Sequence, residues 1–266
     1  MSQGLRFLTF LAPNVYPVYD AAARFVARHL KVGTELAVGQ DFAQIGSGPA
    51  DVAFICGLPY VQLTRRRPSP VELLAAPVLA GERYGGRAIY YSDVIVRHDA
   101  PWRSFAELRG ATWAFNDPDS HSGYNITRYR LVQMGETRGF FGRVVQAGMH
   151  QRAIRLVCSG DVDASAIDSQ VLAVELRDHP DLAPQLKIIE ALGPASIQPV
   201  VIASAAPAGL KADVRAALLA MADDEEGRRG LAQGFVERFV AVADTDYDDI
   251  RAMLATAEAT GFLELR

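Results

Sequence analysis

Cysteine is scarce in this chain of 266 residues, which contains only Cys56 and Cys158. Each cysteine lies in an apolar run, and their spacing matches no metal-binding motif, so we expect two buried structural thiols and no metal site. Long apolar runs are also missing, because none approaches the roughly 20 residues that a membrane-spanning helix needs. The sequence therefore predicts a soluble globular protein without a membrane-spanning segment.

The sequence has no excess of positive charge. It contains 27 Lys and Arg residues against 31 Asp and Glu residues, and its formal net charge is -4. Affinity for the phosphate backbone of nucleic acids rests on clustered basic residues, so no nucleic-acid partner is expected. The one basic run, Arg65–Arg67, precedes Pro68 and is typical of a solvated turn.

A secretory signal is not visible at the N-terminus. Residues 1–17 contain one arginine and a short apolar run, which continues into a predicted strand without a small-residue cleavage site. Two locations follow as alternatives. The protein is expected to be periplasmic or extracellular if the sequence is a mature form, and cytoplasmic if Met1 is the native start.

A regular alternation of strand-like and helix-like segments is present. Half of the residues are hydrophobic, enough for a substantial core. A strand pattern at residues 5–12 is followed by a helical pattern at 19–30 and by strand patterns at 34–39 and 51–57. The alternation starts again near Ser104. This order is the signature of an α/β fold with mainly parallel sheets.

Two α/β units are predicted, the second inserted into the first. Residues 1–96 and 199–266 would form lobe 1, which includes a helical C-terminal segment, and residues 97–198 would form lobe 2. The chain would pass between the lobes in extended stretches near residues 94–97 and 199–203. Two crossing strands make a hinge, and a hinge between two lobes makes a ligand cleft.

The segment NDPDSHSGYNIT, residues 116–127, predicts a turn that becomes a helix. Ser120, Ser122 and Gly123 stand where a strand meets that helix. The first backbone N–H groups of a helix have no intrahelical acceptor, and the helix dipole adds partial positive charge, so this corner can bind a tetrahedral oxyanion. The alternative is a plain helix cap made by one serine, and local chemistry alone favours the cap.

Four stretches carry a wider pattern. In chain order they are DVAFICGLPYV, YYSDVIVR, SFAELRGATWAFNDPDSHSGY and AGMHQRAIRLVCSGDVDASAIDSQV. Together they resemble the PhnD-like phosphonate-, phosphite- and phosphate-binding components of ABC transporters, over roughly residues 5–205. The resemblance implies a two-lobed α/β fold of the type II periplasmic-binding-protein class, a small anionic ligand, and an ABC permease as a further partner.

The resemblance also implies where the ligand binds. Ser120 to Gly123 correspond to the anion cradle of the family, and His150 to a histidine that contacts the oxyanion. Tyr60 and Tyr90 correspond to aromatic hydroxyl positions on the other lobe. Tyr16 is a further candidate from the first strand-to-helix loop. The candidate ligand-binding residues are thus Ser120, His121, Ser122, Gly123, His150, Asp168, Tyr60, Tyr90 and Tyr16.

Asp168 corresponds to the aspartate of the family's DS pair. A buried carboxylate facing an anion is repulsive unless a proton lies between them, so Asp168 would favour an oxyanion that keeps a P–OH group and would reject sulfate. Each assignment has a structural alternative: a helix N-cap for Asp168, an exposed and idle side chain for His150, and core or rim aromatics for Tyr60 and Tyr90.

Two functions remain open at this point. The first is a non-enzymatic solute-binding protein for a small phosphorus oxyanion or phosphonate. The alternative is a cytosolic enzyme or ligand sensor on the same fold, since folds host unrelated chemistry. No GxSxG elbow, P-loop, paired metal spacing or GxGxxG motif is present, so neither a catalytic residue nor a cofactor is expected.

Overall fold

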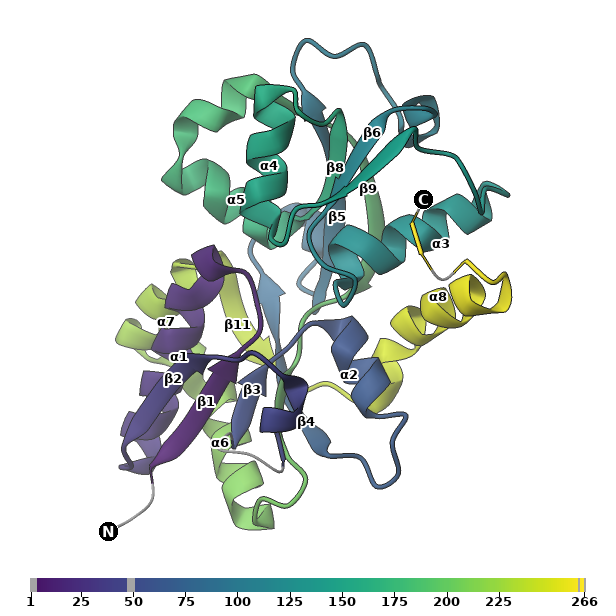
Figure 1. The fold of residues 1–266 in the computed structure, drawn as a ribbon. Coiled ribbons are helices and arrows are strands. Elements are labelled where there is room, and N and C mark those ends of the chain that lie inside the picture. The colour runs from purple at the N-terminus through teal and green to yellow at the C-terminus, as the bar shows by residue number, and fades with distance from the viewer. Residues whose placement is uncertain (1–3, 47–50, 263, 266) are drawn as a thin grey trace. The chain divides into compact units, whose positions relative to one another are not determined.

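The chain folds into two compact units in a computed structural model that describes residues 4–46, 51–262 and 264–265 (Figure 1). Unit 1 comprises Met1–Ile89 and Ser196–Asp248, and unit 2 comprises Tyr90–Ala195 and Asp249–Arg266. The chain passes between the units after Ile89, after Ala195 and again after Asp248. The third passage was not predicted, because all of residues 199–266 were assigned to lobe 1.

Unit 1 is built on a six-stranded mixed sheet of order β11-β4-β10-β3-β1-β2. The strand β1 pairs in parallel with β2 and β3, whereas β10 runs antiparallel to β3 and β4, and β11 antiparallel to β4. The central strand β3 is buried along its whole length, as its continuous apolar run predicts. The strands are β1 Leu5–Thr9, β2 Thr34–Val38, β3 Val52–Phe54, β4 Val71–Leu79, β10 Val200–Ala203 and β11 Val236–Val240.

Within the described residues, unit 1 contains four α-helices. They are α1 Tyr16–Leu30, α2 Gly57–Leu63, α6 Ala208–Ala220 and α7 Glu225–Ala232. The helix α1 buries Val18, Ala22 and Val26 at helical spacing and packs against α6 and α7. Lys31 caps its C-terminal end with a left-handed φ of 56°, a conformation that commonly closes helices.

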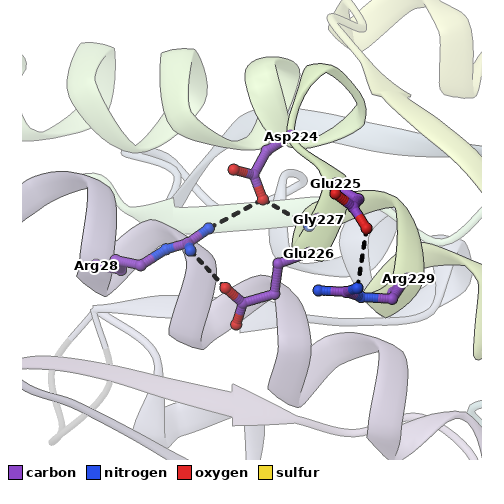
Figure 2. Close-up of polar contacts among 6 residues, drawn as sticks. All are labelled: Arg28, Asp224, Glu225, Glu226, Gly227 and Arg229. Atoms are coloured by element: carbon purple, nitrogen blue, oxygen red, sulfur yellow. Dashed lines mark hydrogen bonds and ion pairs between the residues drawn. The ribbon is translucent and has the colours of Figure 1, made fainter.

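Close packing and charge together join α1 to α7. A Cβ atom on Gly230 would lie 2.7 Å from Cβ of Ala21, so glycine lets the two helices approach each other. Figure 2 shows Arg28 of α1 reaching both Asp224, at 3.1 Å, and Glu226, at 2.5 Å. Asp224 also caps α7 by accepting a hydrogen bond from the Gly227 N–H, and this bond, more than Arg28, lowers the pKa of its carboxyl group.

Unit 2 contains a five-stranded sheet of order β7-β6-β8-β5-β9. The strand β6 is parallel to β7 and β8, and β5 is antiparallel to β8. A buried aromatic group supports the sheet: the ring of Trp113 stacks on Phe141 at 4.7 Å, and Phe105 stacks on Phe140 at 5.7 Å. The strands are β5 Ile89–Arg97, β6 Thr112–Phe115, β7 Arg143–Gln146, β8 Ala164–Asp168 and β9 Leu186–Ser196.

The helices of unit 2 include one irregular turn at the predicted corner. The segment His121–Asn125 is a π-helical turn that leads directly into α3, Ile126–Gln133. The other helices are α4 His150–Ser159, α5 Ser169–Asp178 and α8 Asp248–Ala259. The predicted alternation of strands and helices is confirmed in both units, and the α/β class is as expected. The expectation of mainly parallel sheets is wrong for unit 1, because three of its five strand pairings are antiparallel.

The C-terminal segment after α8 is bonded to the corner of unit 2. The Arg128 Nε atom donates to the carbonyl of Phe262 at 2.8 Å, and the Leu265 N–H donates to the hydroxyl of Tyr124 at 3.2 Å. In Figure 1 this segment, in yellow, lies beside α3. These long-range bonds explain why residues 249–266 belong with unit 2. The sequence could not predict this, because helical periodicity does not show which partner a helix packs on.

The thiols of Cys56 and Cys158 are both half-buried rather than fully buried. The expectation of fully buried thiols was therefore wrong. In the part of the chain that is described, no helix has both the length and the apolar character to span a bilayer.

Candidate anion site

The corner between β6 and α3 is built around Ser120. Its Oγ accepts a hydrogen bond from the Gly123 N–H at 3.1 Å, and its carbonyl accepts one from the Asn125 N–H at 3.1 Å. The first bond is a helix cap, as the simpler alternative predicted. The second spans five residues and widens the turn, which is the geometry of a π-helical turn and is frequent at functional sites.

A second serine extends the corner toward α4. Ser122 Oγ lies 3.3 Å from Ser120 Oγ and 3.0 Å from Nε2 of His150, the first residue of α4. All three side chains are buried. The structure therefore brings together two hydroxyls and an imidazole that the sequence had placed at two separate helix starts, and the expectation of an exposed, idle His150 is wrong.

Gly123 sits where the side chains of Asn116 and His150 meet the backbone. A Cβ atom at this position would lie 1.9 Å from Oδ1 of Asn116 and 3.3 Å from Cε1 of His150. Real Cβ atoms do not tolerate the first distance, so a side chain at position 123 would displace Asn116. Glycine is required here because of this close approach.

His121 is enclosed between the turn and β5. Its Nδ1 lies 3.2 Å from the Nδ2 amide of Asn125, and its ring centroid lies 6.4 Å from that of Tyr90. Because the Asn125 nitrogen is a donor, His121 Nδ1 acts as the acceptor. Burial lowers the pKa of His121 to about 3.

His150 is also neutral under ordinary conditions. Burial lowers its pKa to about 3, because the low-dielectric surroundings disfavour the imidazolium. The groups gathered at the corner are therefore hydroxyls, amides and neutral imidazoles. Groups of this kind can bind an anion through hydrogen bonds and local dipoles rather than through a formal positive charge.

Asp168 closes β8 and starts α5. Its Oδ1 accepts hydrogen bonds from the N–H groups of Gln170, at 2.8 Å, and Val171, at 3.2 Å. This is the N-cap that was expected as the alternative to a ligand role. The cap does not exhaust the carboxylate, which offers about four lone-pair sites on its two oxygens.

Tyr90 lies in β5 and belongs to unit 2, the same unit as the serines. The expectation that it faces the anion from the other lobe is therefore corrected. The reason lies in the path of the chain. Strand β5 passes into unit 2 at Tyr90, before the predicted boundary after residue 96, and its residues Ser92 to Val96 pair with β8. The Tyr90 side chain is buried against His121.

Tyr60 and Tyr16 belong to unit 1, and each hydroxyl has a partner within that unit. The Tyr60 hydroxyl donates to Oδ1 of Asp244 at 2.5 Å, and its ring packs 4.8 Å from that of Tyr247. The Tyr16 hydroxyl donates to the carbonyl of Leu36 at 2.8 Å. Their part in ligand binding stays a prediction.

Three polar residues at this site were missed from the sequence. Asn116 and Asn125 flank the serines within the quoted corner, and Ser92 pairs with Asp168 across β5 and β8. Paired residues of an antiparallel ladder point to the same face, so Ser92 lies beside Asp168. The hydroxyl residue within the YYSDVIVR stretch was the available signal. Among the described residues, no cluster of His, Cys, Asp or Glu is arranged to hold a metal ion.

The comparisons with known proteins agree with this geometry. A family model described as "ABC transporter, phosphonate, periplasmic substrate-binding protein" matches residues 9–247. This chain belongs to that family. The match covers both units, includes the serine corner, and confirms the family resemblance of the sequence motifs.

Solved structures show the same fold at low sequence identity. A binding protein component of an ABC phosphonate transporter from Pseudomonas aeruginosa has a TM-score of 0.82 and 19% identity, covering 98% of this chain and 89% of that one. PhnD1 from Prochlorococcus marinus in complex with methylphosphonate has a TM-score of 0.82 and 17% identity, covering 97% and 98%. A protein from Xanthomonas citri bound to ATP has a TM-score of 0.73 and 17% identity, covering 98% of both chains.

Membership of the family decides between the two functions that the sequence left open. The chain is a substrate-binding protein with the type II periplasmic-binding-protein fold, and not an enzyme. Substrate-binding components of ABC transporters work with a small ligand and a permease, and both kinds of partner follow for this chain.

Proposed function

We propose that this protein captures a small phosphorus oxyanion (a phosphonate, phosphite or phosphate) at the Ser120–Gly123 corner and delivers it to an ABC permease in the periplasm. The observation that carries the proposal is the line of buried groups from the Gly123 N–H through Ser120 and Ser122 to His150, with distances of 3.1, 3.3 and 3.0 Å. A tetrahedral oxyanion has oxygens that can accept from both hydroxyls at once.

The neutral character of the corner narrows the ligand class. The two buried imidazoles carry no charge, and Asp168 contributes a carboxylate, so nothing in this group offsets a doubly charged anion. A monoanion that keeps a P–OH group can also donate to the carboxylate of Asp168. Sulfate has no such proton near neutral pH and is expected to bind much more weakly.

The test is isothermal titration calorimetry with methylphosphonate, phosphite, phosphate, sulfate and ATP on the purified protein. We expect binding of at least one small phosphorus oxyanion, and a loss of affinity of roughly tenfold or more in Ser122→Ala, since it removes a hydrogen bond to a charged group. Ser159→Ala is the matched control, because Ser159 closes the opposite end of α4 and bonds to Leu156 and Asp161.

Two results would count against the proposal. One is that none of the small phosphorus oxyanions binds while ATP or sulfate does. The other is that Ser122→Ala binds as tightly as the unmodified protein, which would place the ligand elsewhere. The periplasmic location is tested separately, by fractionating cells that express the gene from its native start.

A further inference from the structure

Each serine of the corner is in contact with one nitrogen. The Gly123 N–H donates to Ser120 Oγ at 3.1 Å, and Nε2 of His150 lies 3.0 Å from Ser122 Oγ. The two hydroxyl oxygens lie 3.3 Å from each other. Each hydroxyl oxygen therefore has one nitrogen neighbour, which is a backbone nitrogen for Ser120 and an imidazole nitrogen for Ser122.

The direction of the Ser122 bond follows from counting hydrogens. A hydroxyl has one hydrogen, and a Ser122 that donates to a bound oxyanion cannot also donate to His150. At 3.0 Å, two lone pairs would then face each other unless Nε2 carries the imidazole hydrogen. Ser122 can therefore serve as an anion donor only if His150 is the donor in their shared bond.

The second nitrogen of His150 supports the same tautomer. Among the described residues, His150 Nδ1 is buried and has no hydrogen-bond partner. A neutral imidazole places its one hydrogen on either nitrogen, so hydrogen on Nδ1 would leave a buried donor without an acceptor. Buried orphan donors are rarer than under-satisfied acceptors, which favours hydrogen on Nε2.

We propose that His150 is a positioning residue that acts through Ser122: it is held as the Nε2–H tautomer, donates to Ser122 Oγ, and so turns the Ser122 hydroxyl hydrogen toward the oxyanion. The part that concerns the ligand rests on the function proposed above. The tautomer itself is a property of the free protein. Ser120 needs no such help, because the Gly123 N–H can only donate and already leaves the Ser120 hydrogen available.

The tautomer is tested by long-range ¹H–¹⁵N correlation spectra of the free protein labelled with ¹⁵N-histidine. His150 is assigned from the signals that vanish in His150→Gln. A spectrum of the Nε2–H form supports the proposal, and a spectrum of the Nδ1–H form overturns it. Because no ligand is added, this result does not depend on whether the proposed ligand class is right.

The action through Ser122 is tested by a double-mutant cycle on the affinity for methylphosphonate, or for whichever oxyanion the calorimetry identifies. His150→Leu removes the donor and should weaken binding roughly tenfold or more, whereas His150→Gln can place an amide N–H near the Nε2 position and should restore most of the affinity. In a Ser122→Ala background, His150→Leu should cause little further loss.

One outcome of the cycle would overturn the proposal. If His150→Leu weakens binding equally with and without the Ser122 hydroxyl, His150 contacts the ligand itself and does not act through the serine. Failure of every oxyanion to bind would instead contradict the proposed function, and the spectrum of the free protein would still decide the tautomer.

Discussion

Ser122 Oγ lies 3.0 Å from Nε2 of His150, a residue 28 positions further along the chain. The contact joins the start of α4 to the turn before α3, and both side chains are buried. Because burial keeps His150 neutral, the contact depends on pH only below the ordinary range of histidine.

Stability should fall as the pH drops below the ordinary histidine pKa of about 6.5. Burial lowers the pKa of His121 and His150 to about 3, so between pH 6.5 and 3 the unfolded chain binds protons that the folded chain does not. The free energy of unfolding therefore decreases with falling pH, by about 1.4 kcal/mol per pH unit for each histidine. Urea unfolding at pH 7 and pH 5 measures this loss.

Carboxylates also titrate in this pH range, so the informative quantity is the difference between variants. The stability of His150→Gln should depend less steeply on pH than that of the unmodified protein. The exposed Ile188→Ala, which removes no titratable group, should show the same dependence as the unmodified protein. Equal slopes in all three proteins would show that His150 is not protected from protonation.

Gly123→Ala should lower stability by about 1–3 kcal/mol and reduce ligand affinity, because the new Cβ atom would lie 1.9 Å from Oδ1 of Asn116. Denaturant unfolding gives the first quantity and calorimetry the second. The double variant Asn116→Ala/Gly123→Ala removes the clashing atom and should recover part of the lost stability. No recovery would mean that the strain lies in the backbone of the turn rather than against Asn116.

Substitutions at Asp168 should separate its cap from its ligand role. Asparagine is also a good N-cap residue, so Asp168→Asn should keep the stability within roughly 0.5 kcal/mol, whereas Asp168→Ala should lose about 1–2 kcal/mol. We expect both variants to lose affinity for an oxyanion with a P–OH group, because neither has a carboxylate. Calorimetry that finds unchanged binding in Asp168→Asn would leave Asp168 with the capping role alone.

Tyr60→Phe should lower the free energy of unfolding by about 1 kcal/mol, because it removes the hydrogen bond to Asp244 but keeps the buried ring. Thermal or denaturant unfolding checks this value. The family resemblance further predicts weaker ligand binding in this variant. Tyr16→Phe is the companion variant. If the ligand affinity is unchanged in both variants, neither the Tyr60 nor the Tyr16 hydroxyl contributes to ligand binding.

Phe262→Ala should destabilise the protein by about 3 kcal/mol or more, since Phe262 is only 4% exposed and lies in the segment bonded to α3. The control is Ile188→Ala, because Ile188 of unit 2 is 51% exposed and its truncation should change stability by less than about 0.5 kcal/mol. A similar, small effect of both substitutions would show that the C-terminal segment does not stabilise unit 2.

Local sequence patterns determined the secondary structure and one feature of the site. Helical spacing of apolar residues predicts α1, a continuous apolar run predicts β3, and the hydroxyl before a glycine predicts the cap at Ser120. These features depend on interactions between residues close in the chain, such as capping and the burial of one helical face, so they can be read from a short window. The four motifs in order further identified the family.

Only the tertiary structure decided which distant residues meet. It placed His150 against Ser122, put Tyr90 beside His121, and joined the C-terminal segment to unit 2 through Arg128. None of these contacts leaves a period in the sequence, because strand order and helix packing set them across many residues. The sequence by itself therefore determined the elements, the serine corner and the family, and the fold decided how the side chains at that corner are hydrogen-bonded.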